Sequence, residues 1–275
     1  MSYYETHAHY HHKKLRNKLN VLLPQLESAD IGKIIEIPIS LDSNAEVIQL
    51  KKEVNAMGYT DLFSFAVGVH PNCITWTTSD DEQVEDILKQ YIANNVDAVV
   101  AVGETGLDYY RCDGLEERKR QQIWFRKQIE LALEFHLPLI LHIRDAHEQA
   151  LPILEEYHKI HPQLHGVCHC FTGDSQVAKQ YIDKGFLLGI GGMVTHEVST
   201  ELRECVESVD LRYIVLETDS PYLKPECVKG KVNTSLNLSV ICECIATLKE
   251  IDKQVVEQVT YENACRLFGK CIRYQ

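Results

Sequence analysis

Short apolar segments alternate with longer amphipathic segments along most of the chain, and this alternation constrains the fold more than any other feature. Seven of eight predicted strands are nearly continuously apolar, which is typical of parallel strands buried on both faces. The strands are predicted at residues 2–5, 33–39, 62–69, 98–102, 139–142, 166–170, 186–190 and 213–216. Helices are predicted between them at about residues 14–28, 44–57, 80–94, 115–135, 146–158, 175–184 and 199–208.

Eight strands that alternate with helices predict an α/β fold, a (β/α)8 TIM barrel. Two further helices, at residues 237–249 and 253–268, would be additional C-terminal helices. An open doubly wound sheet would need fewer strands, and no Gly-x-Gly-x-x-Gly motif follows any of them. With no linker, repeat or low-complexity segment, residues 1–275 are expected to form a single domain. In the helix at 115–135, we expect Ile123, Ile129, Ala132 and Leu133 to pack inward.

Composition favours a globular cytoplasmic protein. Hydrophobic residues make up 45% of the chain and charged residues 25%, so a large core can be buried. No segment approaches the length of apolar sequence that a membrane span needs, and the N-terminus lacks the apolar run of a signal peptide. Without an export signal, the ten cysteines indicate a reducing compartment, and we expect inert thiols in the pairs Cys168/Cys170 and Cys242/Cys244. A monomer or weak homo-oligomer is expected.

The net charge of −12 argues against a protein that coats duplex DNA, because nonspecific affinity for nucleic acid comes mainly from Lys and Arg. It does not exclude a nuclease. Two bound divalent cations would add about four positive charges at the place where a phosphate must lie.

Residue types that bind metal ions stand at or just after the predicted strands. In such a barrel, side chains at the C-terminal ends of different strands converge on one mouth. Four imidazoles and two carboxylates exceed the needs of one four-coordinate ion and suit a pair of bridged divalent ions. The six predicted ligands are His7, His9, Glu104, His142, His169 and Asp219.

Ordered motifs along the chain resemble those of the TatD family of metal-dependent hydrolases, which are amidohydrolase-type barrels. After the opening His-x-His come "VGVHP" (67–71), "VGETGLDYY" (102–110), "LPLILHIRDA" (137–146), "GVCHCFTGD" (166–174), "GIGGMVT" (189–195), "LETDSPYL" (216–223) and "TYENACRLFG" (260–269). The resemblance implies an enzyme that hydrolyses phosphodiester bonds with Mg²⁺, Mn²⁺ or Zn²⁺, a deoxyribonuclease that acts like a 3′–5′ exonuclease on DNA.

The resemblance also implies a role for each ligand. His7 and His9 would bind one ion, His142 and His169 the second, and Glu104 would bridge both. Asp219 would bind the first ion and handle the proton, so that Glu104 and Asp219 are the catalytic residues. Two such ions can clamp the attacking and leaving oxygens and lower the pKa of a bound water from near 16 toward about 7. Imidazoles favour zinc or manganese over magnesium, and the identity of the metal stays open.

Four further residues are predicted to contact substrate: His70, Arg144, Asp108 and Tyr109. His70 follows the third strand and Arg144 could fork a phosphate. The alternatives are that His70 packs on Pro71, that Arg144 pairs with Asp145 or Glu148, and that Asp108 and Tyr109 only shape their loop.

The chain departs from the family pattern at two places. Glu5 stands where an aspartate is usual, and the segment at 231–237 lacks the usual Arg and Glu and is expected near the mouth. The expected substrate is DNA, as single strands or frayed ends. The alternative is a small ester or phosphate, with hydrolysis of an amide, lactone, carboxylic ester or aminoacyl-tRNA ester on the same metals. A barrel that binds a partner without catalysis is a further alternative.

Overall fold

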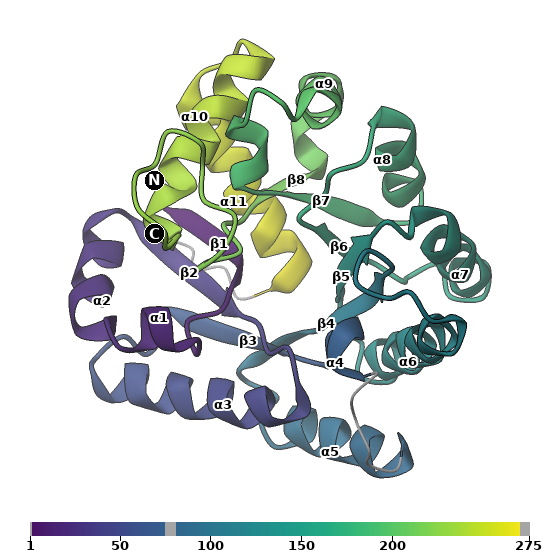
Figure 1. Ribbon diagram of the computed structural model, residues 1–275. Coiled ribbons are helices and arrows are strands. Elements are labelled where there is room, and N and C mark those ends of the chain that lie inside the picture. Colours follow the sequence, from purple (N-terminus) through teal and green to yellow (C-terminus); the bar gives the residue numbers. More distant parts are fainter. Residues whose placement is uncertain (1, 75–80, 270–275) are drawn as a thin grey trace.

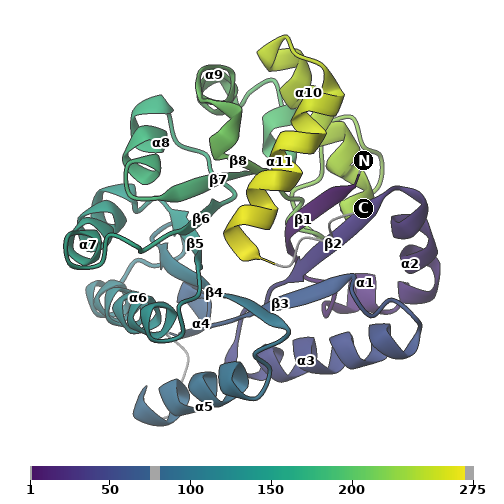
Figure 2. The same cartoon turned by 180° about the vertical axis from the view of Figure 1, so that it is seen from behind.

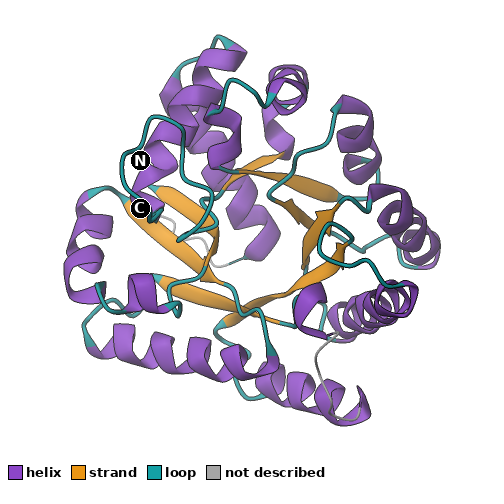
Figure 3. Cartoon of the chain, in the orientation of Figure 1, coloured by secondary structure: helices purple, strands orange, loops and turns teal. Residues whose placement is uncertain are grey.

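The structure, a computed structural model, describes residues 2–74 and 81–269 and is built around one parallel eight-stranded sheet (Figure 1). The strands pair in chain order, each with the next. In Figure 3 they form a ring with most of the helices outside it. The strands are β1 (Tyr3–Ala8), β2 (Ile31–Glu36), β3 (Phe63–Val67), β4 (Val99–Asp108), β5 (Leu139–Arg144), β6 (Gly166–His169), β7 (Phe186–Ile190) and β8 (Ile214–Leu216).

Helices follow the strands, so the predicted (β/α)8 barrel with additional C-terminal helices is confirmed. They are α1 (Lys13–Arg16), α2 (Leu19–Ser28), α3 (Leu41–Ala56), α4 (Pro71–Ile74), α5 (Asp81–Ala93), α6 (Leu115–Glu134), α7 (His147–Ile160), α8 (Ser175–Ile182), α9 (Thr200–Ser208), α10 (Leu238–Lys249) and α11 (Lys253–Phe268). Short 3-10 turns are η1 (Gly192–Thr195), η2 (Leu211–Tyr213) and η3 (Ser235–Asn237). Within residues 2–74 and 81–269, no helix has the length and apolar character needed to cross a membrane.

Some predicted boundaries were wrong. The helix predicted at 14–28 is divided into α1 and α2, and the predicted start of the third helix at Asp80 lies outside the described residues. β1 continues to Ala8 and β4 to Asp108, so His7 and Glu104 lie within strands instead of following them.

The inside of the barrel is a separate apolar cluster that α11 closes at one end. Side chains alternate across each strand, and the inward-facing set includes Tyr4, Ile35, Val100 and Ile140. Phe268 of α11 belongs to the same cluster. In the reverse view α11 lies across the barrel (Figure 2). α11 therefore plugs the end opposite the C-terminal mouth.

The buried face of α6 differs from the prediction. Ile129 and Ala132 are buried as expected, but Ile123 is 49% exposed. The face of α6 that packs on the barrel includes Gln128. Its side chain accepts from the backbone N–H of Val69 and donates to the Val69 carbonyl and to the hydroxyl of Thr105. Because this buried glutamine is hydrogen-bonded, it can belong to the buried face of α6, which therefore differs from the face that the apolar residues alone indicate.

The cysteines of the two C-x-C pairs are free thiols, with Cys168 and Cys242 buried and Cys170 and Cys244 half-buried. Cys265 in α11 is disulfide-bonded, which no spacing in the sequence indicated.

The seam between β1 and the segment after β8 completes the barrel through polar contacts. Ala8 and Ser220 form a parallel bridge, and the Asp219 N–H donates to the His7 carbonyl (3.0 Å). The fully buried carboxylate of Glu5 accepts from the backbone N–H (2.8 Å) and hydroxyl (2.6 Å) of Thr218. Glu5 therefore joins the first strand to the segment that carries Asp219.

We expect Glu5→Ala to lower the free energy of unfolding by about 3 kcal/mol, because it leaves buried donors of Thr218 without an acceptor. Urea denaturation would measure the loss, with Glu27→Ala as the control on the exposed face of α2. Equal stabilities of the two variants would contradict this role for Glu5.

Candidate metal centre

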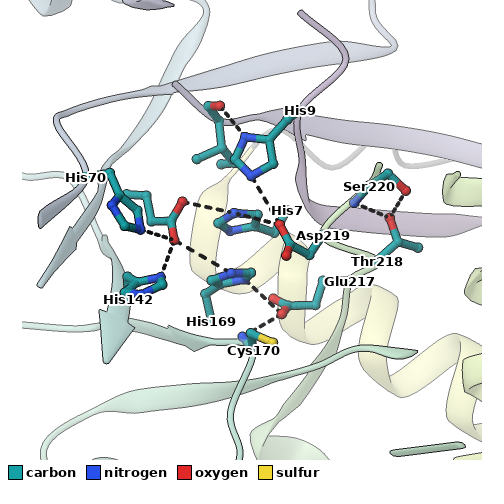
Figure 4. A network of polar contacts seen from close by, with 12 residues as sticks. His7, His9, His70, His142, His169, Cys170, Glu217, Thr218, Asp219 and Ser220 are labelled. Carbon is teal, nitrogen blue, oxygen red and sulfur yellow. Dashed lines mark hydrogen bonds and ion pairs between the residues drawn. The ribbon is translucent and has the colours of Figure 1, made fainter. Parts of the chain in front are cut away.

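The six predicted ligands lie together at the C-terminal ends of the strands, gathered around two carboxylates. Glu104 lies closest to His142, with Oε1 2.6 Å from Nδ1. Its oxygens also lie 3.5 Å from His7 Nε2 and 3.8 Å from His169 Nε2. Asp219 Oδ1 lies 3.1 Å from His9 Nε2 and 3.8 Å from His7 Nε2. Figure 4 shows the imidazoles of this group turned toward one another beside Asp219.

The backbone brings these side chains close by two local features. Gly106 lets β4 approach β5, because a Cβ there would lie 2.2 Å from the carbonyl oxygen of His142. Asp219 has a φ of 54°, in the left-handed region that aspartate tolerates better than most residues. The turn projects its carboxylate back over the end of β1.

In three of the imidazoles, one ring nitrogen lies close to an oxygen atom outside the group. The second ring nitrogen is then directed at the two central carboxylates. His9 Nδ1 donates to the carbonyl oxygen of Ile37 (2.8 Å). His142 Nε2 lies 3.2 Å from Asp108 Oδ2, and His169 Nδ1 lies 2.9 Å from Glu217 Oε1. Such outer partners fix the ring orientation and tautomer of histidines that bind metal ions.

The surroundings of His7 are the clearest indication that the site can bind a cation. Its ring is fully buried and stacked on His169, with 3.3 Å between ring centroids, and neither ring nitrogen has a hydrogen-bond partner. An unsatisfied buried nitrogen is costly, and coordination to a cation would satisfy it. The groups His7, His9, Glu104 and Glu104, His142, His169 each have ligand atoms within 4.8 Å of one another. These residues fit divalent cations, and Glu104 is common to both groups.

The charges in this group are strongly coupled. Burial would raise the pKa of Glu104, but the neighbouring imidazoles of His70, His7 and His142 hold it well below its usual range. Burial opposes protonation of His9 and His142, yet Asp219 raises the pKa of His9 to about 9, and Asp108 and Glu104 raise the pKa of His142 to about 9. Both carboxylates are therefore anions at neutral pH, as cation ligands must be.

Comparison with known proteins identifies the group to which the chain is related. A family model described as TatD related DNase matches residues 4–269. The chain belongs to the TatD family. It is 30% identical over 266 residues to YabD of Bacillus subtilis (strain 168), an uncharacterized metal-dependent hydrolase, covering 96% of this chain and 98% of that protein. It is 39% identical over 212 residues to YcfH of Escherichia coli (strain K12), another uncharacterized metal-dependent hydrolase, covering 77% of this chain and 76% of YcfH.

Solved structures agree with this assignment. YJJV, a TatD homolog from Escherichia coli K12, superposes with a TM-score of 0.86 at 26% identity, covering 98% of each chain. An organophosphorus hydrolase from Deinococcus radiodurans shares the fold alone, with a TM-score of 0.64 at 13% identity over 96% of this chain and 93% of that one. The predicted resemblance to TatD proteins is confirmed, and the protein is a TatD-family metal-dependent hydrolase.

Two residues predicted to touch substrate do lie at the mouth of this TatD barrel. His70 Nε2 is 3.7 Å from Glu104 Oε1, and its Nδ1 accepts the backbone N–H of Asn72 (3.0 Å). The alternative for Arg144, an ion pair with Asp145 or Glu148, is not found among the described residues. Its guanidinium instead stacks on Tyr110, 3.8 Å from the ring centroid.

The other two take different positions from those predicted. Asp108 is buried and accepts from Asn72 Nδ2 (2.7 Å) as well as contacting His142, so it supports a candidate ligand. Tyr109 is buried against α6, where its hydroxyl accepts from Gln122 Nε2 (2.7 Å). Tyr109 thus packs away from the candidate ligands, which favours the alternative that it only shapes its loop.

The segment at 231–237, which was expected near the mouth, is anchored by buried polar side chains. Asn233 and Ser235 are fully buried. Asn233 Nδ2 donates to the carbonyl of Thr218 (2.8 Å), and Ser235 Oγ accepts from the hydroxyl of Tyr10 (2.9 Å). The segment ties the turn that carries Asp219 to the residues after β1.

Sequence reasoning missed two buried carboxylates. Glu217 accepts the backbone N–H of Cys170 (2.6 Å) and holds His169. Its position two residues before Asp219 on an extended segment could have indicated it. Glu36 accepts the backbone N–H of His11 (2.7 Å), and its Oε1 lies 2.6 Å from His11 Nδ1. An acid at the end of an apolar strand was its signal.

Glu217→Ala should weaken binding of Mn²⁺ by about 10- to 100-fold, because the ring of His169 loses the partner that orients it. Isothermal titration of the metal-free protein would measure the affinity, and circular dichroism would verify the fold. Glu201→Ala, on the exposed side of α9, is the matched control and should bind as the unaltered protein does. An unchanged affinity in Glu217→Ala would show that Glu217 does not support the site.

Proposed function

We propose that this TatD-family hydrolase is a deoxyribonuclease that cleaves phosphodiester bonds with two divalent cations, Zn²⁺, Mn²⁺ or Mg²⁺. The observation that carries the proposal is the sharing of Glu104 between two groups of imidazoles. A shared carboxylate offsets the repulsion between neighbouring cations, and a cation pair suits a phosphodiester because it can face both the attacking and the leaving oxygen. Residues 1–275 would act as one catalytic domain, since the family match covers residues 4–269.

The assignment of ligands follows the distances. His7, His9 and Asp219 would hold one cation, His142 and His169 the other, and Glu104 would contact both. When bound, the cations would polarise the phosphoryl group and lower the pKa of a coordinated water. The protein's own contribution is the rigid placement of these side chains on four different strands and on the turn after β8.

Asp219 is the group best placed to accept the proton of the attacking water. It is the most exposed of the two central carboxylates, with 15% of its side chain open against 4% for Glu104. Burial would raise the pKa of Asp219, but His9, His169 and His7 lower it, so the carboxylate is ionised and can accept a proton at neutral pH.

His70 and Arg144 would bind the scissile phosphate. Burial, together with the charge of His142, lowers the pKa of His70 to about 3, so the ring is neutral. Because Nδ1 accepts a backbone N–H, the ring proton is on Nε2, which can donate to a phosphate oxygen. Arg144 lies two residues past His142 on β5 and offers a guanidinium on the same face of the strand.

Glu104→Ala and Asp219→Ala should each reduce kcat/KM on a single-stranded oligonucleotide by about 10⁴-fold with the fold retained. The first change removes the shared ligand and the second removes the proton acceptor. Glu148→Ala, an exposed carboxylate near the start of α7, is the control and should retain activity. Unaltered turnover in either site variant would refute the role given to that residue.

The nature of the scissile bond is tested by substrate comparison. Chelation should abolish activity and added Mn²⁺ or Zn²⁺ should restore it. Under the restored condition, the protein should cleave single-stranded DNA faster than a panel of carboxylic esters, lactones and amides. The reverse order of rates would replace the nuclease assignment with a hydrolase of those bonds.

A further inference from the structure

The exposed aromatic rings of the described residues lie around the mouth of the barrel. Among the Phe, Trp and Tyr residues within 2–74 and 81–269, only Tyr110 and Tyr222 are exposed, at 60% and 43%. Both follow the C-terminal ends of strands, Tyr110 after β4 and Tyr222 after β8. Exposed tyrosines without a binding role would be expected on other parts of the surface as well.

Tyr110 lies on the β4–β5 side of the mouth and is covered on one face by a cation. The guanidinium of Arg144 stacks on its ring. Arg144 shares the inward-facing side of β5 with His142, so the stacked ring also lies on the side of the metal centre. Although Arg144 covers it, Tyr110 stays more than half exposed, and its remaining surface is open to a ligand.

Tyr222 lies on the β8–β1 side in a similar setting. Its ring centroid is 6.0 Å from that of His9, 5.9 Å from that of His12 and 6.0 Å from Nζ of Lys14. The ring therefore lies beside the candidate ligand His9 and beside a basic residue of α1.

The two sides face each other across the metal centre. In a ring of eight strands paired in chain order, β4 and β5 stand opposite β8 and β1. His142 extends from one side and His9 from the other, and both reach the central carboxylates. A ligand that touches both tyrosines must pass over Glu104 and Asp219. A small ester needs neither ring to reach that point.

This arrangement matches the chemistry of an unpaired nucleic-acid strand. Proteins bind single strands by stacking bases on aromatic rings and by placing cations along the backbone, whereas a duplex keeps its bases stacked within itself. Arg144, Lys14 and Arg111 are exposed, and none of them forms an ion pair within the described part of the chain. Arg144 is available to the scissile phosphate, and Lys14 and Arg111 are available to the phosphates beside it.

We propose that Tyr110 and Tyr222 are base-stacking residues on opposite sides of the mouth, which hold a single-stranded nucleic acid across the metal centre on both sides of the scissile phosphate. The proposal rests on the proposed nuclease function and deepens it, because it names the two residues that select an unpaired strand over a small diester.

The test compares two substrates that share the scissile bond and differ in reach. One is a single-stranded oligothymidylate and the other is methyl p-nitrophenyl phosphate, assayed with Mn²⁺. Tyr110→Ala and Tyr222→Ala should each raise KM for the strand about tenfold, and the double variant about 100-fold, because stacking contributes at each ring independently. The values for the small diester should not change. Tyr110→Phe and Tyr222→Phe keep the rings and should match the unaltered protein on both substrates.

A strand with abasic positions completes the test. The unaltered protein should bind this strand about tenfold less tightly for each base contact that is lost. The alanine substitutions should not weaken binding of the abasic strand any further. Unchanged KM for the strand in both alanine variants, while the unaltered protein still cleaves it, would overturn the stacking roles and leave the nuclease function standing. An equal loss on the small diester would also overturn them, since it would mean damage to the metal centre. If the unaltered protein hydrolyses the diester and not the strand, the nuclease function fails and the stacking proposal fails with it.

Discussion

One buried carboxylate, that of Glu104, is the point on which the arrangement of the mouth depends. It receives imidazoles from β1, β5 and β6, and its burial is tolerable only because positive charge surrounds it. The histidines are buried at a cost as well, since neither ring nitrogen of His7 has a hydrogen-bond partner. Burial of so many polar groups at the mouth lowers the stability of the fold, and cation binding would offset this loss. The TatD fold and its candidate metal centre are in this sense one structure.

The contacts that close the barrel also position part of the candidate metal centre. β8 is only three residues long, so the seam with β1 is completed by the segment that carries Asp219 and Ser220. Glu5 accepts two hydrogen bonds from Thr218, and Asn233 donates to the carbonyl of the same residue. The longer side chain at position 5 and the altered segment at 231–237 therefore both act on one buried polar group. This explains how two departures from the family pattern can coexist with an undisturbed set of candidate ligands.

The sequence predicted the barrel and the six converging side chains because both depend on order along the chain. Strand order fixes which ends meet, and residue type fixes what can meet there. Other features depend on how far each strand extends. Because β4 continues to Asp108, that residue supports His142, Tyr109 turns to α6 and Tyr110 reaches the opening. The exposed Ile123 has a similar cause, since the buried Gln128 of α6 is satisfied only by Val69 and Thr105, which are distant in sequence.

The net charge of the protein bears on the ligand proposed for the mouth. At a net charge of −12, most of the protein repels a polyanion, so the usual source of nonspecific affinity for nucleic acid is missing. Attraction would come from bound cations and from exposed basic residues near the mouth such as Lys14, Arg111 and Arg144, which form no ion pair with another described residue. A rigid duplex would have to bring many phosphates near the acidic surface in order to place one at the centre. A flexible strand can bring a few phosphates to the mouth while its bases stack on Tyr110 and Tyr222, so the charge distribution and the exposed rings favour the same ligand.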